Sequence, residues 1–159
     1  GLPIDYNNPE KNYIPNFSEY FNIYKKNIIL LKNQKIFVEL GRSLVGQCGN
    51  LISRVLFTKN SYDKNYVILD AGMTELIRPA LYNSYHKISN LTFTENKFKK
   101  YDVVGPLCES SDIFLKNIKL PFSKRDDIFR IYSCGAYGET MSSNYNLRNS
   151  IKSYYSDMI

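Results

Sequence analysis

The sequence predicts two parts of different fold class, an α/β segment followed by an all-β domain. Apolar side chains recur at helical spacing over residues 16–32, and the apolar run 35–40 follows after a short polar turn. Beyond Cys48 come short β-branched or aromatic segments separated by polar turns. We therefore expect residues 1–48 to form a helix and a buried parallel strand, and residues 49–159 to form an antiparallel β-sandwich or β-barrel.

Local patterns predict the individual elements. Asn16 and Glu19 have the spacing of an N-terminal capping pair, so a helix is expected to begin there. The stretch GMTELIRPALY, residues 72–82, is expected to be a short helix or turn that ends near Pro79. Five segments have the composition of strands: 51–59, 65–70, 85–93, 100–105 and 127–135.

Composition and charge disfavour two classes of protein, membrane-spanning and nucleic-acid-binding. The chain of 159 residues is 43% hydrophobic, enough for a core, but it has no run of 18 apolar residues, which disfavours a membrane span. The net charge of +6 comes from scattered lysines, so a solvated basic surface is favoured over a nucleic-acid interface. About 48 residues are too few for a complete α/β domain, so we expect the rest of it upstream.

Three cysteines and one histidine limit the available chemistry. Cys48, Cys108 and Cys134 are odd in number and widely spaced, which fits neither a disulfide framework nor a metal site. We therefore expect a reducing, cytoplasmic compartment and no bound metal. His86 would have to serve any Ser-His or Cys-His nucleophile, but its alternating segment favours an ordinary strand residue.

Residues just past the predicted strand could contact a ligand. Glu39, Gly41 and Arg42 stand where the carboxyl end of a parallel strand faces a ligand crevice. Gly41 would permit close approach of the backbone, and Arg42 offers a planar fork for phosphate or carboxylate. Glu39 could hold a protonated ring nitrogen. An exposed Glu–Arg pair at a turn explains the same residues equally well.

Three further segments carry candidate groups. Arg78 and Tyr82 could clamp a carboxylate from one helical turn, although an arginine that covers apolar surface is the better explanation of that segment alone. Cys108 follows the turn-forming pair 105–106 and could act as an acid, whereas a lone cysteine is more often inert. Tyr137 stands between two glycines, where it could reach a phosphate or mark an ordinary hairpin tip.

Taken together, four segments of the chain resemble the diaminopimelate decarboxylases, a branch of the fold-type III pyridoxal-phosphate decarboxylase family. The matching strings are ELGRSLV at 39–45, DAGMTELIRPALY at 70–82, VVGPLCESSD at 103–112 and GAYGETMSSNYN at 135–146. Their order and spacing agree with the family over nearly the whole chain. The combination of CESSD with IRPALY is specific to the branch that acts on diaminopimelate.

The resemblance implies a fold, a cofactor and a reaction. Residues 1–48 would be the C-terminal end of a (β/α)8 barrel, and residues 49–159 the β domain that follows it. The cofactor would be pyridoxal 5'-phosphate, and the reaction the decarboxylation of meso-diaminopimelate to L-lysine and CO2, the last step of lysine biosynthesis. A homodimer is implied, because in this family the loop of Cys108 and Glu109 reaches into the neighbouring subunit's site.

The resemblance also assigns roles to individual residues. Glu39 would pair with the pyridine nitrogen of the cofactor, and Cys108 would donate a proton to the carbanion left by decarboxylation. Arg78 and Tyr82 would hold the distal carboxylate of the substrate, and Glu109 its distal ammonium. The remaining cofactor contacts would come from Gly1, Leu40, Gly41, Arg42 and Tyr137. Arg42 and Tyr137 would also contact the substrate.

Some features depart from the family pattern. Leu40 stands where the family usually has Pro, and residues 148–159 differ from its usual closing strands. The Schiff-base lysine lies early in the family's barrel, and no lysine here follows a matching motif, so we expect no decarboxylation by the isolated chain. The alternatives are a decarboxylase of the same fold acting on another basic amino acid, a non-catalytic remnant or interaction domain, and a nucleic-acid-binding β-barrel.

Overall fold

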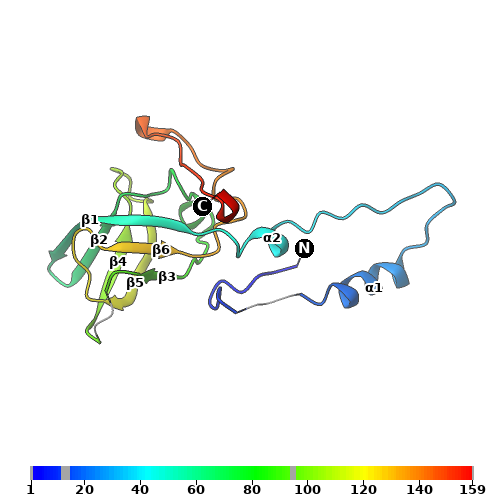
Figure 1. Cartoon of the computed structure of the whole chain (residues 1–159), viewed down its shortest axis with the longest axis horizontal. Coiled ribbons are helices and arrows are strands. Elements are labelled where there is room, and N and C mark those ends of the chain that lie inside the picture. The colour runs from blue at the N-terminus through cyan, green and yellow to red at the C-terminus, as the bar shows by residue number, and fades with distance from the viewer. Residues whose placement is uncertain (1, 12–14, 94–95, 159) are drawn as a thin grey trace.

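A six-stranded sheet forms the body of the protein, and an extended N-terminal arm projects from it (Figure 1). The computed structural model describes residues 2–11, 15–93 and 96–158. The strand order is β3-β6-β1-β2-β4-β5. The edge strands β3 and β5 contact each other, so the sheet is nearly closed into a barrel. The strands are β1 (Leu51–Ser61), β2 (Lys64–Leu69), β3 (Ile88–Asn90), β4 (Phe98–Val104), β5 (Ile113–Pro121) and β6 (Ile128–Ile131).

The sheet is mixed, whereas the sequence predicts an antiparallel one. Strands β2 and β4 are paired in parallel, with Val67 opposite Val103, and all the other neighbouring pairs are antiparallel. The antiparallel prediction is therefore wrong at this pair. The physical reason is the long connection between the two strands, which carries helix α3 and strand β3 and brings the chain back to the same end of the sheet.

The core lies inside this curved sheet. In the first half of β1, from Leu51 to Val55, buried residues alternate with exposed ones, which is the pattern of a strand with one face in the interior. The other strands contribute the same kind of apolar face. The fully buried side chains of this core include Val55, Val67, Leu69, Leu76, Val103, Phe129 and Ile131.

Among the strands of the described residues, β5 is the one that the sequence patterns did not predict. Its middle is polar, with Lys116 and Asn117 both exposed. Asn117 has a positive φ of 54°, and its amide donates to the Asp102 carboxylate at 2.7 Å. The register shifts nearby, between Tyr101 and Val103. This bulge breaks the alternation of apolar and polar residues on which strand prediction depends.

The predicted helix and its cap are confirmed, but the helix is shorter than expected. Helix α1 spans Phe17–Asn27, and Asn16 Oδ1 accepts the Glu19 amide at 3.0 Å. The Asn16 side-chain amide also donates to the Glu19 carboxylate at 3.1 Å. The helix stops five residues before Lys32, and none of its residues is buried. Without a surface to pack against, the following Ile-Ile pair has little to hold it helical.

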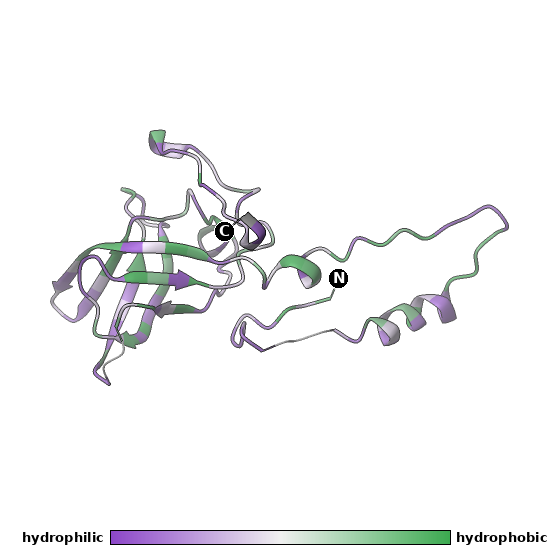
Figure 2. Cartoon of the chain, viewed as in Figure 1, coloured by the Kyte–Doolittle hydropathy of each residue, from purple (hydrophilic) through white to green (hydrophobic). Residues whose placement is uncertain are grey.

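The run KIFV does not form the predicted strand. Residues 35–38 are extended but unpaired, and Phe37 is 86% exposed. A parallel strand exists only by pairing with neighbours, and no described residue pairs with this run. Figure 2 shows hydrophobic segments along the arm that contains α1, well away from the sheet. The apolar character that predicted a buried strand is therefore present, but it faces solvent.

Within the part of the chain that the structure describes, four short helical elements complete the fold. Helix α3 (Arg78–Tyr82) begins at Arg78, with Pro79 in its first turn, so the prediction that the segment ends near Pro79 is wrong. Proline fits the first turn of a helix because the amide it lacks would be unpaired there. No helix within the described ranges is long and apolar enough to cross a bilayer. The other elements are α2 (Arg42–Val45), η1 (Tyr145–Leu147) and η2 (Ser156–Met158).

Candidate active site

Four of the residues singled out in the sequence line one hollow. Arg42, Arg78, Tyr82 and Tyr137 surround a space of about 370 Å³, together with Ser84 and Met141. Arg42 comes from α2, Arg78 and Tyr82 come from α3, and Tyr137 comes from the loop after β6. Segments nearly 100 residues apart in the sequence thus meet at one place, as the ligand interpretation of these motifs requires.

The two arginines lie against the same aromatic ring. The Arg42 guanidinium carbon is 5.5 Å from the centroid of the Tyr137 ring, and that of Arg78 is 5.4 Å from it. Arg78 also lies 5.8 Å from the ring centroid of Tyr82. These cation–π contacts orient both guanidinium groups without neutralising either of them. The hollow is therefore rich in positive charge.

Arg78 is a buried cation without an ionic partner among the described residues. Arg78 is only 5% exposed, and its Nη2 donates to the hydroxyls of Tyr6 at 3.4 Å and Ser84 at 3.3 Å. Its Nε has no hydrogen-bond partner. Burying a charge that is matched only by neutral hydroxyls is costly. The arrangement therefore favours an anion beside Arg78.

Gly41 is required by both its conformation and its surroundings. Its φ is +58°, a region that side chains disfavour, and a Cβ there would lie 3.3 Å from the Tyr137 hydroxyl. The backbone at Gly41 consequently approaches the phenol closely. The neighbouring Leu40 carbonyl accepts the Ser43 hydroxyl at 3.0 Å, which steadies the turn into α2.

Five described residues with predicted roles do not line this hollow: Glu39, Leu40, Gly41, Cys108 and Glu109. Glu39 is exposed and does not line it, although it is only three positions before Arg42. Cys108 and Glu109 are exposed on the loop between β4 and β5 and also do not line it. The predicted contact from Gly1 falls outside the described residues.

The loop of Cys108 and Glu109 is tied to the C-terminal segment. The Tyr145 hydroxyl donates to Glu109 Oε1 at 2.5 Å. This hydrogen bond, to a carboxylate, raises the pKa of the Tyr145 phenol above its ordinary value. Tyr145 lies inside the family-like string 135–146, but no role was assigned to it from the sequence, because an exposed tyrosine has many ordinary explanations.

The surroundings of Arg78 include residues that were assigned no role in the site from the sequence. Tyr6 contacts Arg78 and also packs edge-on against His86, with ring centroids 5.1 Å apart. His86 is buried two residues before β3, so it is not the strand residue that was expected. Its Nδ1 lies 2.9 Å from the Tyr132 carbonyl, and burial lowers its pKa. Ser84 and Met141 line the hollow without having been singled out, and only the tertiary fold brings them there.

Comparison with known proteins shows the family to which the chain belongs. Residues 13–135 match the family described as the C-terminal sheet domain of the pyridoxal-dependent decarboxylases. The chain belongs to this family. Like the other members, it carries a sheet domain, and the match ends at residue 135, after β6 and two residues before Tyr137.

Curated relatives and several of the similar solved structures are named diaminopimelate decarboxylases. The enzyme of Bacteroides thetaiotaomicron is 52% identical over 157 residues, which are 99% of this chain and 40% of that protein. The enzyme of Aquifex aeolicus is 39% identical over 150 residues, covering 93% and 34%. The Helicobacter pylori enzyme complexed with L-lysine matches with a TM-score of 0.76 at 38% identity, covering 92% and 35%. The chain therefore spans 40% or less of these relatives' lengths.

Proposed function

We propose that the chain is the C-terminal part of a diaminopimelate decarboxylase, which converts meso-diaminopimelate to L-lysine and CO2 with pyridoxal 5'-phosphate. The observation that carries this proposal is the buried, ionically unpartnered Arg78 in a hollow shared with Arg42, Tyr82 and Tyr137. Identity of 52% to a diaminopimelate decarboxylase supports the choice of reaction. Three free cysteines fit the reducing cytoplasm, which we propose as its location.

The chain divides, in this proposal, at about residue 48. Residues 1–48 would be the last portion of a (β/α)8 barrel, and residues 49–159 the β domain. The regular sheet begins at Leu51, and the exposed apolar side chains of the arm, such as Ile29 at 94% and Phe37, are of the kind that a barrel core would cover. Both features support this division.

Arg78 and Tyr82 would hold the carboxylate at the far end of the substrate. A guanidinium that has already lost its hydration gains a strong, charge-assisted contact when a carboxylate enters. Tyr82 lies beside it on α3 and would supply a hydroxyl. A substrate with two amino-acid heads provides the second carboxylate that this site needs, whereas ornithine or arginine provides none there.

The residues around Tyr137 fit the anionic end of the cofactor. The backbone at Gly41 and the Tyr137 hydroxyl approach each other closely, beside the positive charge of Arg42, which suits a phosphate. Leu40 and Gly1 would complete this side, and Glu39 would pair with the ring nitrogen. Pyridoxal phosphate, when bound, supplies the electron sink that lets the carboxylate leave as CO2. Arg42 would also steady a substrate carboxylate near it.

Cys108 and Glu109 would act in the site of a second subunit. Both are exposed and lie away from the hollow of their own chain, as a loop that serves a neighbour would. The Cys108 thiol would hold the proton that the substrate carbon receives after CO2 leaves, and the Glu109 carboxylate would contact the distal ammonium. A homodimer with shared sites follows from this assignment.

The test is a substrate comparison with the full-length enzyme that contains this sequence. Meso-diaminopimelate, L-ornithine and L-arginine are incubated separately with enzyme and pyridoxal phosphate, and CO2 and the amine products are measured. We expect L-lysine from diaminopimelate and little product from the other two. Faster reaction with ornithine or arginine, or no reaction with diaminopimelate, would contradict the proposal.

A further inference from the structure

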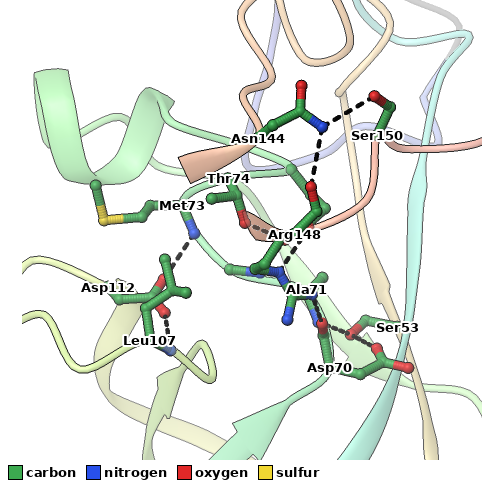
Figure 3. A network of polar contacts seen from close by, with 12 residues as sticks. Ser53, Asp70, Ala71, Met73, Thr74, Leu107, Asp112, Asn144, Arg148 and Ser150 are labelled. Carbon is green, nitrogen blue, oxygen red and sulfur yellow. Dashed lines mark hydrogen bonds and ion pairs between the residues drawn. The ribbon is translucent and has the colours of Figure 1, made fainter. Parts of the chain in front are cut away.

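One buried carboxylate joins two loops that the proposed function uses separately. Asp112 is 2% exposed and lies three residues after Glu109, at the end of the loop that carries Cys108. Its Oδ1 accepts the Met73 amide at 2.6 Å, and its Oδ2 accepts the Leu107 amide at 2.8 Å. Figure 3 shows the carboxylate between these two amides, one from each loop.

The space around this carboxylate is shaped for it. A Cβ at Gly72 would lie 2.7 Å from Asp112 Oδ1, and a Cβ at Gly105 would collide with the same group. Neither glycine has a positive φ, so close approach to the carboxylate is the reason for a glycine at both positions. A longer side chain at position 112 has no room between them.

The turn at residues 72–76 is also fixed from its other side. Arg148 Nε donates to Glu75 Oε1 at 3.1 Å, and the Ser143 amide donates to the Thr74 carbonyl at 2.9 Å. Glu75 Oε2 accepts the Gly72 amide at 2.7 Å. The turn is therefore a firm anchor, and Asp112 connects the loop of Cys108 to it (Figure 3).

We propose that Asp112 is a positioning residue that fixes the Cys108–Glu109 loop against the turn leading into α3. This contact fixes the position of the loop, which is proposed to enter the site of a neighbouring subunit, relative to the Arg78 hollow of its own chain. The roles of the loop and of the hollow in catalysis and binding rest on the proposed function. The contact itself is a property of the fold and can be measured without activity.

The charge around Asp112 is consistent with a structural role. Burial raises the pKa of its carboxyl above the ordinary value, and the amides of Leu107 and Met73 partly oppose this. Glu75 raises the pKa further, and Arg148 lowers it. The carboxylate thus takes its stabilisation mainly from two backbone amides and not from an ion pair.

The test compares Asp112→Asn with Asp102→Asn in the full-length enzyme. Asn at 112 turns an NH2 group toward one of the two amide donors and so loses one link. Asp102 is the control, because its carboxylate also accepts a backbone amide, that of Asn117, but between the paired strands β4 and β5 and not in the loop that joins them. Gly72→Ala is a second variant, which presses on Oδ1 from the other side.

The first readout is independent of catalysis. In Asp112→Asn we expect the Met73 or Leu107 amide to exchange hydrogen about ten-fold faster and the alkylation rate of Cys108 to change several-fold, with Cys48 as internal reference. Asp102→Asn should leave both unchanged, and Gly72→Ala should act like Asp112→Asn. Two results would overturn the proposal. One is fast hydrogen exchange at both the Met73 and the Leu107 amide in the unmodified protein. The other is a Cys108 alkylation rate in Asp112→Asn that lies within two-fold of the rate in the unmodified protein.

The second readout is kinetic. We expect Asp112→Asn to lower kcat by about ten-fold or more, since a small misplacement of a reacting group is costly. KM should change by less than about three-fold, because Tyr145 still holds Glu109 and Arg148 still holds the turn. An unchanged kcat would overturn the positioning role. If the unmodified enzyme proved inactive on diaminopimelate, the proposed function would fail, and the exchange and alkylation results would still decide the inference.

Discussion

The Tyr145 hydroxyl donates a 2.5 Å hydrogen bond to the Glu109 carboxylate, joining the C-terminal segment to the loop between β4 and β5. The short distance is that of a hydroxyl bound to an ionised carboxylate. Glu109 is the group proposed to meet the distal ammonium of the substrate. Tyr145 therefore fixes the direction of a side chain that would otherwise be free in solvent.

The first prediction concerns this pair. Tyr145→Phe removes the donor and leaves the Glu109 carboxylate free to rotate, so we expect KM for diaminopimelate to rise by about three- to ten-fold with a smaller effect on kcat. Steady-state kinetics of the full-length enzyme measure both. Tyr62→Phe is the control, since Tyr62 is fully exposed on the β1–β2 turn. An unchanged KM in Tyr145→Phe would show that the bond plays no part in binding.

The second prediction separates stability from function at Arg78. Arg78→Met replaces a buried cation, bound only to neutral hydroxyls, by an apolar side chain of similar length. We expect Tm to stay equal or to rise, because the cost of burying the charge is removed. KM for diaminopimelate should rise about 30-fold or more, the effect of losing one partner of a charge pair. A large fall in Tm would mean that Arg78 is structural.

The third prediction concerns Gly41. Gly41→Ala forces a side chain into a φ of +58° and places a methyl 3.3 Å from the Tyr137 hydroxyl. We expect a loss of about 1–3 kcal/mol of unfolding free energy, measured by urea denaturation. The double variant with Tyr137→Phe should recover only part of it, because the phenol contact is relieved and the backbone strain is not. Full recovery would show that φ contributes nothing.

The fourth prediction ranks the three cysteines. Burial raises the pKa of the Cys134 thiol to about 12, whereas Cys48 and Cys108 are exposed. At pH 8 a thiol with that pKa is ionised in only about one molecule in ten thousand. We expect iodoacetamide to label Cys48 and Cys108 in the native chain and Cys134 only after denaturation, as read by peptide mass spectrometry. Native labelling of Cys134 at a rate comparable to that of Cys48 would contradict the raised pKa of its thiol.

Much of the β domain could be predicted from the sequence because its strands carry local signals. The runs at 51–59 and 65–70 combine β-branched residues with flanking turns, and they became β1 and β2. The parallel pairing of β2 with β4 could not be predicted, because it depends on where a long connection returns the chain. Strand β5 was not predicted for a local reason, because the bulge at Asn117 interrupts its alternation of apolar and polar residues.

The N-terminal part shows the limit of periodicity alone. The cap at Asn16 is a contact between near neighbours, so its spacing was enough to predict it. The strand expected at residues 35–38 depends on partners elsewhere, and its apolar side chains lie exposed without them. A pattern of apolar residues indicates a surface that is suited to burial, but it does not say what buries it.

The residues of the site could be named from the sequence, but their arrangement in space could not. Arg42, Arg78, Tyr82 and Tyr137 were each ambiguous alone, and the family resemblance grouped them before the fold brought them to one hollow. Asp112 lay inside a quoted motif, yet a lone aspartate after two serines has many explanations. Its role depends on Gly72 and Gly105, which only the folded chain brings beside it.

The most direct test of the account is the ratio of kcat/KM for meso-diaminopimelate to that for L-ornithine, measured in the unmodified full-length enzyme and in Arg78→Met. We expect a ratio well above one in the unmodified enzyme and a fall of about 30-fold or more in the variant, because the second carboxylate loses its buried cation. A ratio that Arg78→Met leaves unchanged would contradict the claim that this hollow recognises the substrate.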